Sequence, residues 1–234
     1  MKKWVAILLM VGLMAVGLIG CGSKDQPANA PAPADKQTET QSQSGNDLSS
    51  IMKKASQAKQ MSFDMVMTMS GSDKNSVTSK GKMYVSDKKL RMELETIGMK
   101  MITISNDQKE FYLYNPDEKT ALKMTAPPES ADVPNEWARE DGDVSGFTVV
   151  GEEKKDGYDC VVVTFTEDGA ESKMWIRKDI GMPVRSEVTS AEGTMVVEYK
   201  NYNMGAQPGN LFEIPAGTEI TTMPSMPDMS QIPK

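Results

Sequence analysis

Sulfur carries most of the chemistry that this sequence offers. The 234 residues include 20 methionines and two cysteines but no histidine. Without histidine, the chain lacks the commonest general base and the commonest metal ligand of proteins. A cysteine thiol can accept an acyl group, and thioethers either bind soft ions such as Cu(I) or line an adaptable apolar surface. The positions of the cysteines and methionines therefore limit the functions that the chain can have.

Cys21 follows a short uncharged stretch at the start of the chain. Lys2 and Lys3 precede residues 4–19, and these sixteen residues carry no charge. A membrane-spanning helix needs about 20 apolar residues, so the stretch is typical of the apolar region of a secretory signal. The sequence therefore predicts a signal peptide over residues 1–20.

The residues Leu18-Ile19-Gly20-Cys21 resemble the lipobox of bacterial lipoproteins. The resemblance implies transfer of a diacylglyceryl group to the Cys21 thiol and cleavage just before Cys21. Acyl chains contribute roughly 0.8 kcal/mol per buried CH₂, so two or three of them make a stable anchor. We therefore expect an extracytoplasmic protein that is lipid-anchored to the cell membrane or the outer membrane. The alternative is an uncleaved anchor helix with an incidental cysteine.

Composition divides the remaining chain. Residues 22–45 contain no aromatic and no large aliphatic side chain. Such a segment cannot bury enough apolar surface to offset its chain entropy, so residues 21–45 are predicted to be the lipidated cysteine and a disordered tether. One folded domain is expected over residues 46–222, followed by an irregular tail, rich in methionine and proline, over residues 223–234.

Charge and motifs exclude several classes of function. Removal of the signal takes away two of the 26 basic residues and none of the 33 acidic ones, which leaves a net charge of −9. An acidic chain has no basic surface for nucleic acid. It also contains no Gly-x-Ser-x-Gly motif and no glycine-rich phosphate loop. We therefore expect a protein that is not an enzyme, with no catalytic residues, no metal site of the usual ligands and no cofactor.

The folded part changes hydrophobic period near its start. Apolar residues recur at helical spacing up to about Lys59, which predicts a helix capped by Asn46 or Asp47. From Met61 onward, apolar residues alternate with polar ones, as in β-strands with one apolar face. Turn residues separate roughly ten such strands, so one large antiparallel sheet that curls is expected. Residues 127–146 are predicted to be a loop, with a possible short helix, that covers one face.

Several methionines fall on the predicted apolar face of these strands. Flexible thioethers adapt to ligands of varied shape, so this face is a candidate cavity for acyl chains. The residues predicted to line it are Phe63, Met65, Met67, Met69, Met83, Leu90, Met92, Met99, Met101, Met174, Met195 and Val197.

Two other interpretations of the methionines stay open. One is an ordinary core that happens to use methionine. The other is Cu(I) binding by thioethers, in Met65-x-Met67-x-Met69 or in the tail at Met223, Met226 and Met229. Cys160, the one cysteine left once Cys21 is acylated, lies in an apolar stretch and is expected to be a small core side chain.

Three stretches in the last third of the chain carry a family resemblance. They are MWIRKDIGMPVR at residues 174–185, VEYKNY at 197–202 and LFEIPAG at 211–217. In this order they resemble the carboxyl half of the LolA/LolB-like superfamily, the outer-membrane lipoprotein-sorting proteins and their lipoprotein relatives. The likeness spans most of residues 47–222.

The resemblance implies a mainly β (α+β) fold, an incomplete β-barrel of about eleven antiparallel strands with helices as a lid. It also implies that the apolar cavity holds lipoprotein acyl chains or other lipids. No acyl-contacting residue of the family can be matched here, so none is carried over. A permanent anchor at Cys21 further departs from a soluble carrier, which must leave the membrane.

Two functions are therefore expected from the sequence. The first is a membrane-anchored lipoprotein that binds lipid or lipoprotein acyl chains, as a carrier, acceptor or local chaperone in envelope transport. The second is an envelope lipoprotein that uses the same fold to bind and regulate a protein partner.

Trp175 and Arg177 project from the face opposite Met174, where they are placed to pack a cation over a ring or to form an ordinary surface pair.

Overall fold

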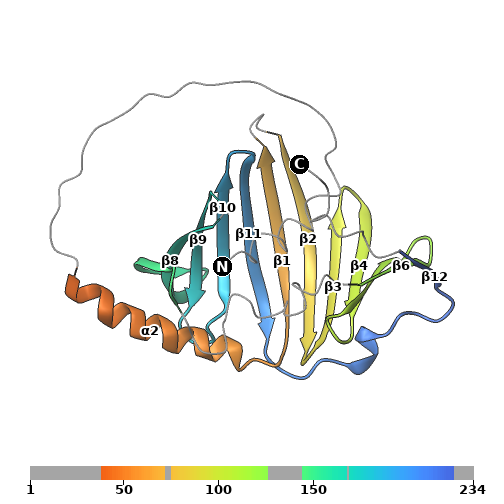
Figure 1. Ribbon diagram of the computed structural model, residues 1–234, viewed down its shortest axis with the longest axis horizontal. Helices are drawn as coiled ribbons and strands as arrows, with labels where there is room; N and C mark the ends of the chain where they lie inside the picture. The colour runs from red at the N-terminus through yellow and green to blue at the C-terminus, as the bar shows by residue number, and fades with distance from the viewer. Residues whose placement is uncertain (1–37, 72–74, 126–143, 168, 224–234) are drawn as a thin grey trace, which may run out of the picture.

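The computed structural model describes residues 38–71, 75–125, 144–167 and 169–223, which form one curved sheet of twelve strands with an N-terminal helix (Figure 1). The predicted class, a mainly β protein built on one large curved sheet, is confirmed. The predicted signal peptide, Cys21, the predicted tether up to residue 37 and the tail from residue 224 lie outside the described residues. So does most of the covering loop predicted at residues 127–146, because residues 126–143 are not described.

The elements follow the turn chemistry of the sequence. In chain order they are α2 (Thr38–Ser56), β1 (Gln60–Gly71), β2 (Ser76–Ser86), β3 (Lys89–Thr96), β4 (Met99–Ser105), β5 (Glu110–Asn115), β6 (Thr120–Thr125), β7 (Thr148–Lys155), β8 (Tyr158–Glu167), β9 (Ala170–Arg177), β10 (Pro183–Ser190), β11 (Gly193–Asn203), the 3₁₀ helix η2 (Gly209–Phe212) and β12 (Glu219–Thr222). Two-residue turns such as Asp156-Gly157, both at positive φ, join neighbouring strands because they match the twist of a hairpin.

Two antiparallel meanders meet in the middle of the sheet. The strand order is β12-β6-β5-β4-β3-β2-β1-β11-β10-β9-β8-β7, so β1 pairs with β2 on one side and with β11 on the other. The two blocks of strands that flank the long loop in the sequence therefore form one continuous sheet.

The structure departs from the sequence prediction in two elements. β12 was not expected as a strand, and it pairs with β6 in parallel rather than antiparallel fashion. Four residues are too short a segment for hydrophobic alternation to reveal. Helix α2 begins at Thr38, so the last residues of the predicted tether are helical instead of disordered. Once packing has nucleated a helix, polar residues extend it at little cost.

Helix α2 packs on one face of the sheet, which we call the inner face. Leu48, Ile51 and Met52 are buried against Val161, Val163 and Ile176 of β8 and β9, while Ala55 reaches the cluster around Met61 of β1. Lys54 Nζ also donates to Lys178 O at 2.6 Å, beyond the end of β9. The helix thus covers one end of the inner face, as the lower part of Figure 1 shows.

The segment after β11 covers part of the opposite, outer face. Ile102 and Ile104 of β4, with Tyr114 and Ala121, form a buried cluster against which Ile214 packs. Arg91 Nη1 donates to Leu211 O at 3.1 Å, and Phe212 of η2 is buried. The described part of the C-terminal segment is therefore a strap that runs to β12 at the sheet edge.

Gly181 sets how closely α2 approaches the turn between β9 and β10. Its φ is +73°, and a Cβ atom there would lie 2.3 Å from Ile51 O and 3.0 Å from Ala55 N. Any side chain at this position would push against the backbone of α2. This contact with the helix follows only from the fold, because Gly181 and α2 lie far apart in the sequence.

We expect Gly181→Ala to destabilise the protein far more than Gly157→Ala. Gly157 has φ +86°, and a methyl group added there would have nothing within 4 Å, so its substitution costs only the left-handed backbone strain of about 1–2 kcal/mol. Gly181→Ala adds a clash of about 1–3 kcal/mol. Urea denaturation of both variants measures the difference, and equal free energies of unfolding would contradict the close contact with α2.

Candidate functional site

The strand register places all twelve residues predicted for the cavity on the inner face. Residues directly opposite on paired strands point to the same side of a sheet. One row crosses Met67, Ser79, Thr96 and Met99 from β1 to β4, and a second crosses Met65, Gly81, Leu94 and Met101.

The remaining predicted residues join the same face. Phe63 lies opposite Met83, which lies opposite Met92, and the next row along contains Leu90. In the other half of the sheet, Met69 lies opposite Met195, and Met67 opposite Val197. Met174 follows in the row of Val197, through Ser186 of β10.

Burial varies strongly along this inner face. Phe63, Met65, Met67, Leu90 and Val197 are buried, and Met83, Met92, Met174 and Met195 are half-buried. Met69, Met99 and Met101 are exposed large apolar side chains. They lie where β1 ends and β4 begins, the end of the sheet away from α2. The apolar face is therefore continuous from a covered end to an open end.

Sequence reasoning left several inner-face residues out of the predicted set. Met61, Val85, Leu94 and Tyr199 follow from the same alternation and belong with it. Tyr202 of β11 was not recognised, because the register of β11 against β1 shifts before it and changes the alternation there. No local signal reveals that shift.

The two tyrosines bring hydroxyl groups to the apolar face. Phe63 packs edge-on against Tyr199 with ring centroids 5.8 Å apart, and at 5.1 Å against Tyr202. The Tyr199 hydroxyl lies 3.3 Å from the Ser186 hydroxyl, and Tyr202 donates to Pro183 O at 2.7 Å. Burial raises the pKa of both phenols, so both stay neutral.

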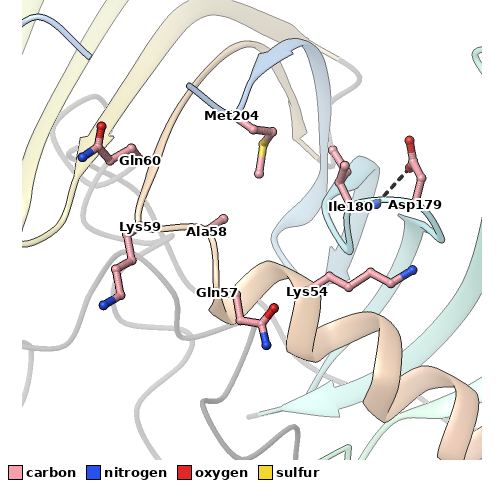
Figure 2. Close-up of a pocket in the computed structure, with 8 residues that line it drawn as sticks. All are labelled: Lys54, Gln57, Ala58, Lys59, Gln60, Asp179, Ile180 and Met204. Carbon is pink, nitrogen blue, oxygen red and sulfur yellow. Dashed lines mark hydrogen bonds between the residues drawn. The ribbon is translucent and has the colours of Figure 1, made fainter. Parts of the chain in front are cut away.

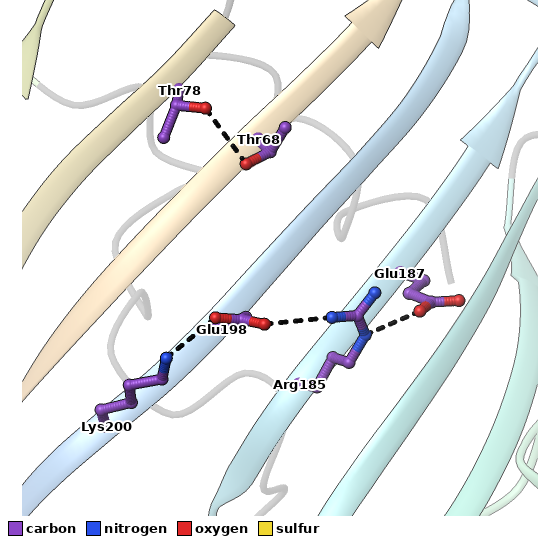
Figure 3. A network of polar contacts seen from close by, with 6 residues as sticks. All are labelled: Thr68, Thr78, Arg185, Glu187, Glu198 and Lys200. Carbon is purple, nitrogen blue, oxygen red and sulfur yellow. Dashed lines mark hydrogen bonds and ion pairs between the residues drawn. The ribbon is translucent and has the colours of Figure 1, made fainter. Parts of the chain in front are cut away.

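The outer face is polar and ion-paired in the same strands. Arg185 donates to Glu187 at 2.7 Å and to Glu198 at 3.2 Å, and Lys200 donates to Glu198 at 3.0 Å (Figure 3). Because Lys200 donates to it, the pKa of Glu198 is lowered. The hydroxyls of Thr68 and Thr78 are 3.3 Å apart on the same side. The two faces of the sheet thus differ sharply in polarity.

Trp175 and Arg177 lie on the outer side as expected, but each has other partners. The Arg177 guanidinium lies 3.5 Å from the ring centroid of Tyr158 and donates two hydrogen bonds to Asp179. Lys173 Nζ lies 4.5 Å from the Trp175 ring, whose indole nitrogen donates to Glu153. Cations therefore pack over rings on this side of the sheet, but Arg177 packs on Tyr158, and Lys173 rather than Arg177 packs on Trp175.

Cys160 is a core residue, as predicted. It packs with Val162, Trp175 and Val184 in a small cluster on the outer side, and it is 1% exposed. Burial raises the pKa of its thiol, which disfavours the reactive thiolate.

Two surface hollows lie elsewhere in the described structure. One, of about 330 Å³, lies between the end of α2, the start of β1 and the turn before β10, with Met204 above it (Figure 2). The other, of about 650 Å³, is lined mainly by threonines and charged side chains of β7 to β10. None of the twelve predicted residues lines either hollow.

The described residues contain neither a cluster of the usual metal ligands nor a membrane-spanning helix. No group of three or more His, Cys, Asp or Glu side chains that could hold a metal ion occurs in this part of the chain. No helix within it is both long and apolar enough to cross a bilayer. Met223 ends the described chain, so the tail methionines proposed for Cu(I), Met226 and Met229, lie outside it.

Family comparison gives one match that covers half of the chain. Residues 63–182 match a family described as a domain of unknown function, DUF4412. The chain belongs to the DUF4412 family. The matched segment runs from β1 to the turn before β10, and it includes most of the methionine-rich inner face. No curated protein sequence matches the chain.

A solved structure shares the architecture of this DUF4412 member at low sequence identity. An uncharacterized conserved protein from Thermus thermophilus matches with a TM-score of 0.54 and 11% identity over 74% of this chain and 98% of that one. This likeness shows the fold alone.

Two further matches have TM-scores below 0.5. A LolA superfamily protein from Nitrosomonas europaea matches at 0.33, with 10% identity over 71% of this chain and 97% of that one. The MucA/MucB complex of Pseudomonas aeruginosa matches at 0.48, with 17% identity over 76% of this chain and 64% of that one. A protein of the LolA superfamily, which the sequence resembles, is therefore among the solved structures to which this chain is similar.

The Arg177–Asp179 pair predicts a pH dependence of stability. The hydrogen bond from Arg177 lowers the pKa of Asp179 below its ordinary value of 3.8. The pair therefore stabilises the fold fully above that ordinary value, and the contribution is lost as pH falls through the lowered pKa.

Asp179→Asn tests this sign. At pH 7 the variant should unfold at lower urea concentration than the parent, and the gap should narrow once pH falls below about 4, where Asp179 begins to resemble Asn. Glu192→Gln is the control and should show a smaller gap, since the exposed Glu192 carboxylate accepts from the nearby Ser190 hydroxyl rather than from a cation. A gap for Asp179→Asn that is constant with pH would contradict the assignment.

Proposed function

We propose that this protein is a membrane-anchored lipoprotein of the cell envelope whose inner face binds the acyl chains of lipids or of acylated lipoproteins. The observation that carries the proposal is the sharing of one face by all twelve predicted residues. Burying apolar chain surface contributes roughly 25 cal/mol per Å², and a continuous apolar face is where that gain is available.

The contrast between the faces supports this proposal. Arg185, Glu187 and Glu198 form an ion-paired network on the outer face, which stays stable in water without a ligand. The open end of the inner face instead exposes Met69, Met99 and Met101 to solvent. Exposed methionine surfaces that adapt in shape are typical of binding to apolar ligands of varied length.

The chemistry of the inner face also argues for binding without catalysis. Its tyrosines, Tyr199 and Tyr202, stay neutral because burial raises their pKa. The one described cysteine, Cys160, lies on the outer side of the sheet and is buried. The side chains that face the proposed ligand therefore serve to exclude water and to fit its shape.

Substitution of Met67 and Met101 together by glutamate tests the proposal. The two residues lie in neighbouring rows of the inner face, and a carboxylate there would have to be desolvated when an acyl chain binds. We expect uptake of a fluorescent fatty acid, and its displacement by unlabelled fatty acid, to fall at least about tenfold, as a loss of 1.4 kcal/mol or more implies.

Two further variants keep this test decisive. Met101→Glu alone changes an exposed residue, so it should fold normally and still weaken uptake. Thr68→Glu with Thr164→Glu places two carboxylates on the outer face, where uptake should be unchanged. Unaltered uptake in folded Met67→Glu/Met101→Glu protein, or no lipid retained in native mass spectrometry of the parent, would exclude the inner face as the site.

A further inference from the structure

Five exposed apolar side chains gather at the end of the sheet away from α2. We call this set the rim: Met69, Val77, Ile97, Met99 and Met101. Val77 lies opposite Met69, and Ile97 is in the turn that joins β3 to β4, just before Met99. Half of the exposed large apolar residues found in the described chain belong to the rim.

Ile97 is exceptional in its backbone as well as in its exposure. Six described residues other than glycine have positive φ: Asp87, Ile97, Gln108, Lys119, Asp156 and Asn201. Five of them are polar, as expected in short turns. Ile97, at φ +51°, is the β-branched one, and a β-branched side chain is strained in this region.

The strain at Ile97 is not compensated by burial. Its side chain is 78% exposed, and Met99 close by is 70% exposed. The turn Asp156-Gly157 has the same φ of +51° at its first residue, but with aspartate there. If position 97 served only to form the turn, a polar residue such as aspartate would be expected there. An apolar side chain in this place gains free energy only if something apolar covers it.

The rim continues into the inner face, and its composition favours lipid over protein as the covering partner. Met99 and Met101 lie in the rows of Met67 and Met65. The rim holds aliphatic and thioether side chains and none of the Trp, Tyr or Arg residues that dominate protein interfaces. Behind it on the outer face, Lys80, Glu95 and Lys100 alternate in charge across the strands.

The length of chain before α2 allows the rim to reach a bilayer. Sixteen residues, 22–37, separate Cys21 from the start of α2. At about 3.3 Å per residue they span at most roughly 50 Å, whereas the twelve residues of β1 span roughly 40 Å. The end of the sheet opposite α2 can therefore face the membrane that holds the anchor.

We infer that the rim docks on the surface of the lipid bilayer, with Ile97 inserted among the lipids, and that acyl chains enter the inner face there. The inference rests on the lipid anchor of the proposed function. Because the charges behind the rim alternate in sign, docking is apolar and varies little with salt or with anionic lipid.

Fluorescence of the reconstituted full chain tests the rim. An environment-sensitive dye is attached to Lys100→Cys beside the rim, or to Lys88→Cys in the turn at the other end of β3. Cys160 is buried, so the dye attaches to the added cysteine. In vesicles of phosphatidylcholine, with or without phosphatidylglycerol, we expect a blue shift and quenching by spin-labelled lipid at Lys100→Cys and neither at Lys88→Cys.

Ile97→Asn, made in the Lys100→Cys background, removes docking without disturbing the fold. Asparagine suits the left-handed turn, so the Tm should stay equal or rise, while the blue shift and the quenching disappear. Asp156→Asn, in the turn with the same φ, is the matched control and leaves both signals unchanged. Fatty-acid uptake from solution is measured on each variant and should be retained, because Ile97 is not part of the inner face.

The outcomes separate this inference from the proposed function. Equal signals at Lys100→Cys and Lys88→Cys, or docking that survives Ile97→Asn, would overturn the rim even where fatty-acid uptake persists. Dye attachment to the parent chain without an added cysteine would show a free Cys21 thiol, which contradicts the lipid anchor. A lower Tm for Ile97→Asn would assign Ile97 a structural role and likewise overturn its insertion into lipid.

Discussion

The whole structure depends on one constraint: an open twelve-stranded sheet cannot cover its own apolar face. In a closed barrel or a sandwich, the inner side chains of one strand pack against those of another. Here a single described helix, α2, packs on the inner face, and it lies over β8, β9 and the start of β1. Towards Met69 and Met99, the described chain leaves the same face exposed. The open end of the face proposed as a binding site, around Met69 and Met99, is the part that α2 does not cover.

The two edges of the sheet and its outer face are protected from contact with other chains and with solvent in different ways. β7, at one edge, has a register shift between Val149 and Gly151 and a charged second half, both of which discourage pairing with another chain. At the other edge, β6 is paired with β12. The strap that leads to β12 buries Phe212 and covers Ile104 on the outer face. The strap therefore buries apolar side chains on the outer face, whereas the apolar side chains of the rim stay exposed.

Local backbone geometry links these features to function. Gly181 permits α2 to lie directly against the turn before β10, and its positive φ is relieved by the lack of a side chain. Ile97 adopts a positive φ without that relief and without burial. At Gly181 the backbone avoids strain, which lets the helix pack closely. At Ile97 the backbone strain is retained in an exposed turn. Retained strain of this kind is common at sites that meet a partner.

The sequence by itself determined which side chains share a face. Alternation along a strand is a property of the local backbone, so the residue types alone assign Met65, Met67 and Met69 to one side. The same reasoning identified Cys160 as a core residue and the twelve-residue apolar face as one surface. It failed at Tyr202, where a register shift between strands far apart in the chain interrupts the alternation.

Only the tertiary structure decided which parts of each face are covered. The contacts that do so join residues far apart in sequence, such as Arg91 with Leu211 and Lys54 with Lys178. The parallel pairing of β12 and the approach of Gly181 to Ile51 are of the same long-range kind. No local pattern encodes them, because they depend on how the whole sheet curves. The sequence therefore predicted an apolar face, and the fold determined that the end near Met99 is the end left open.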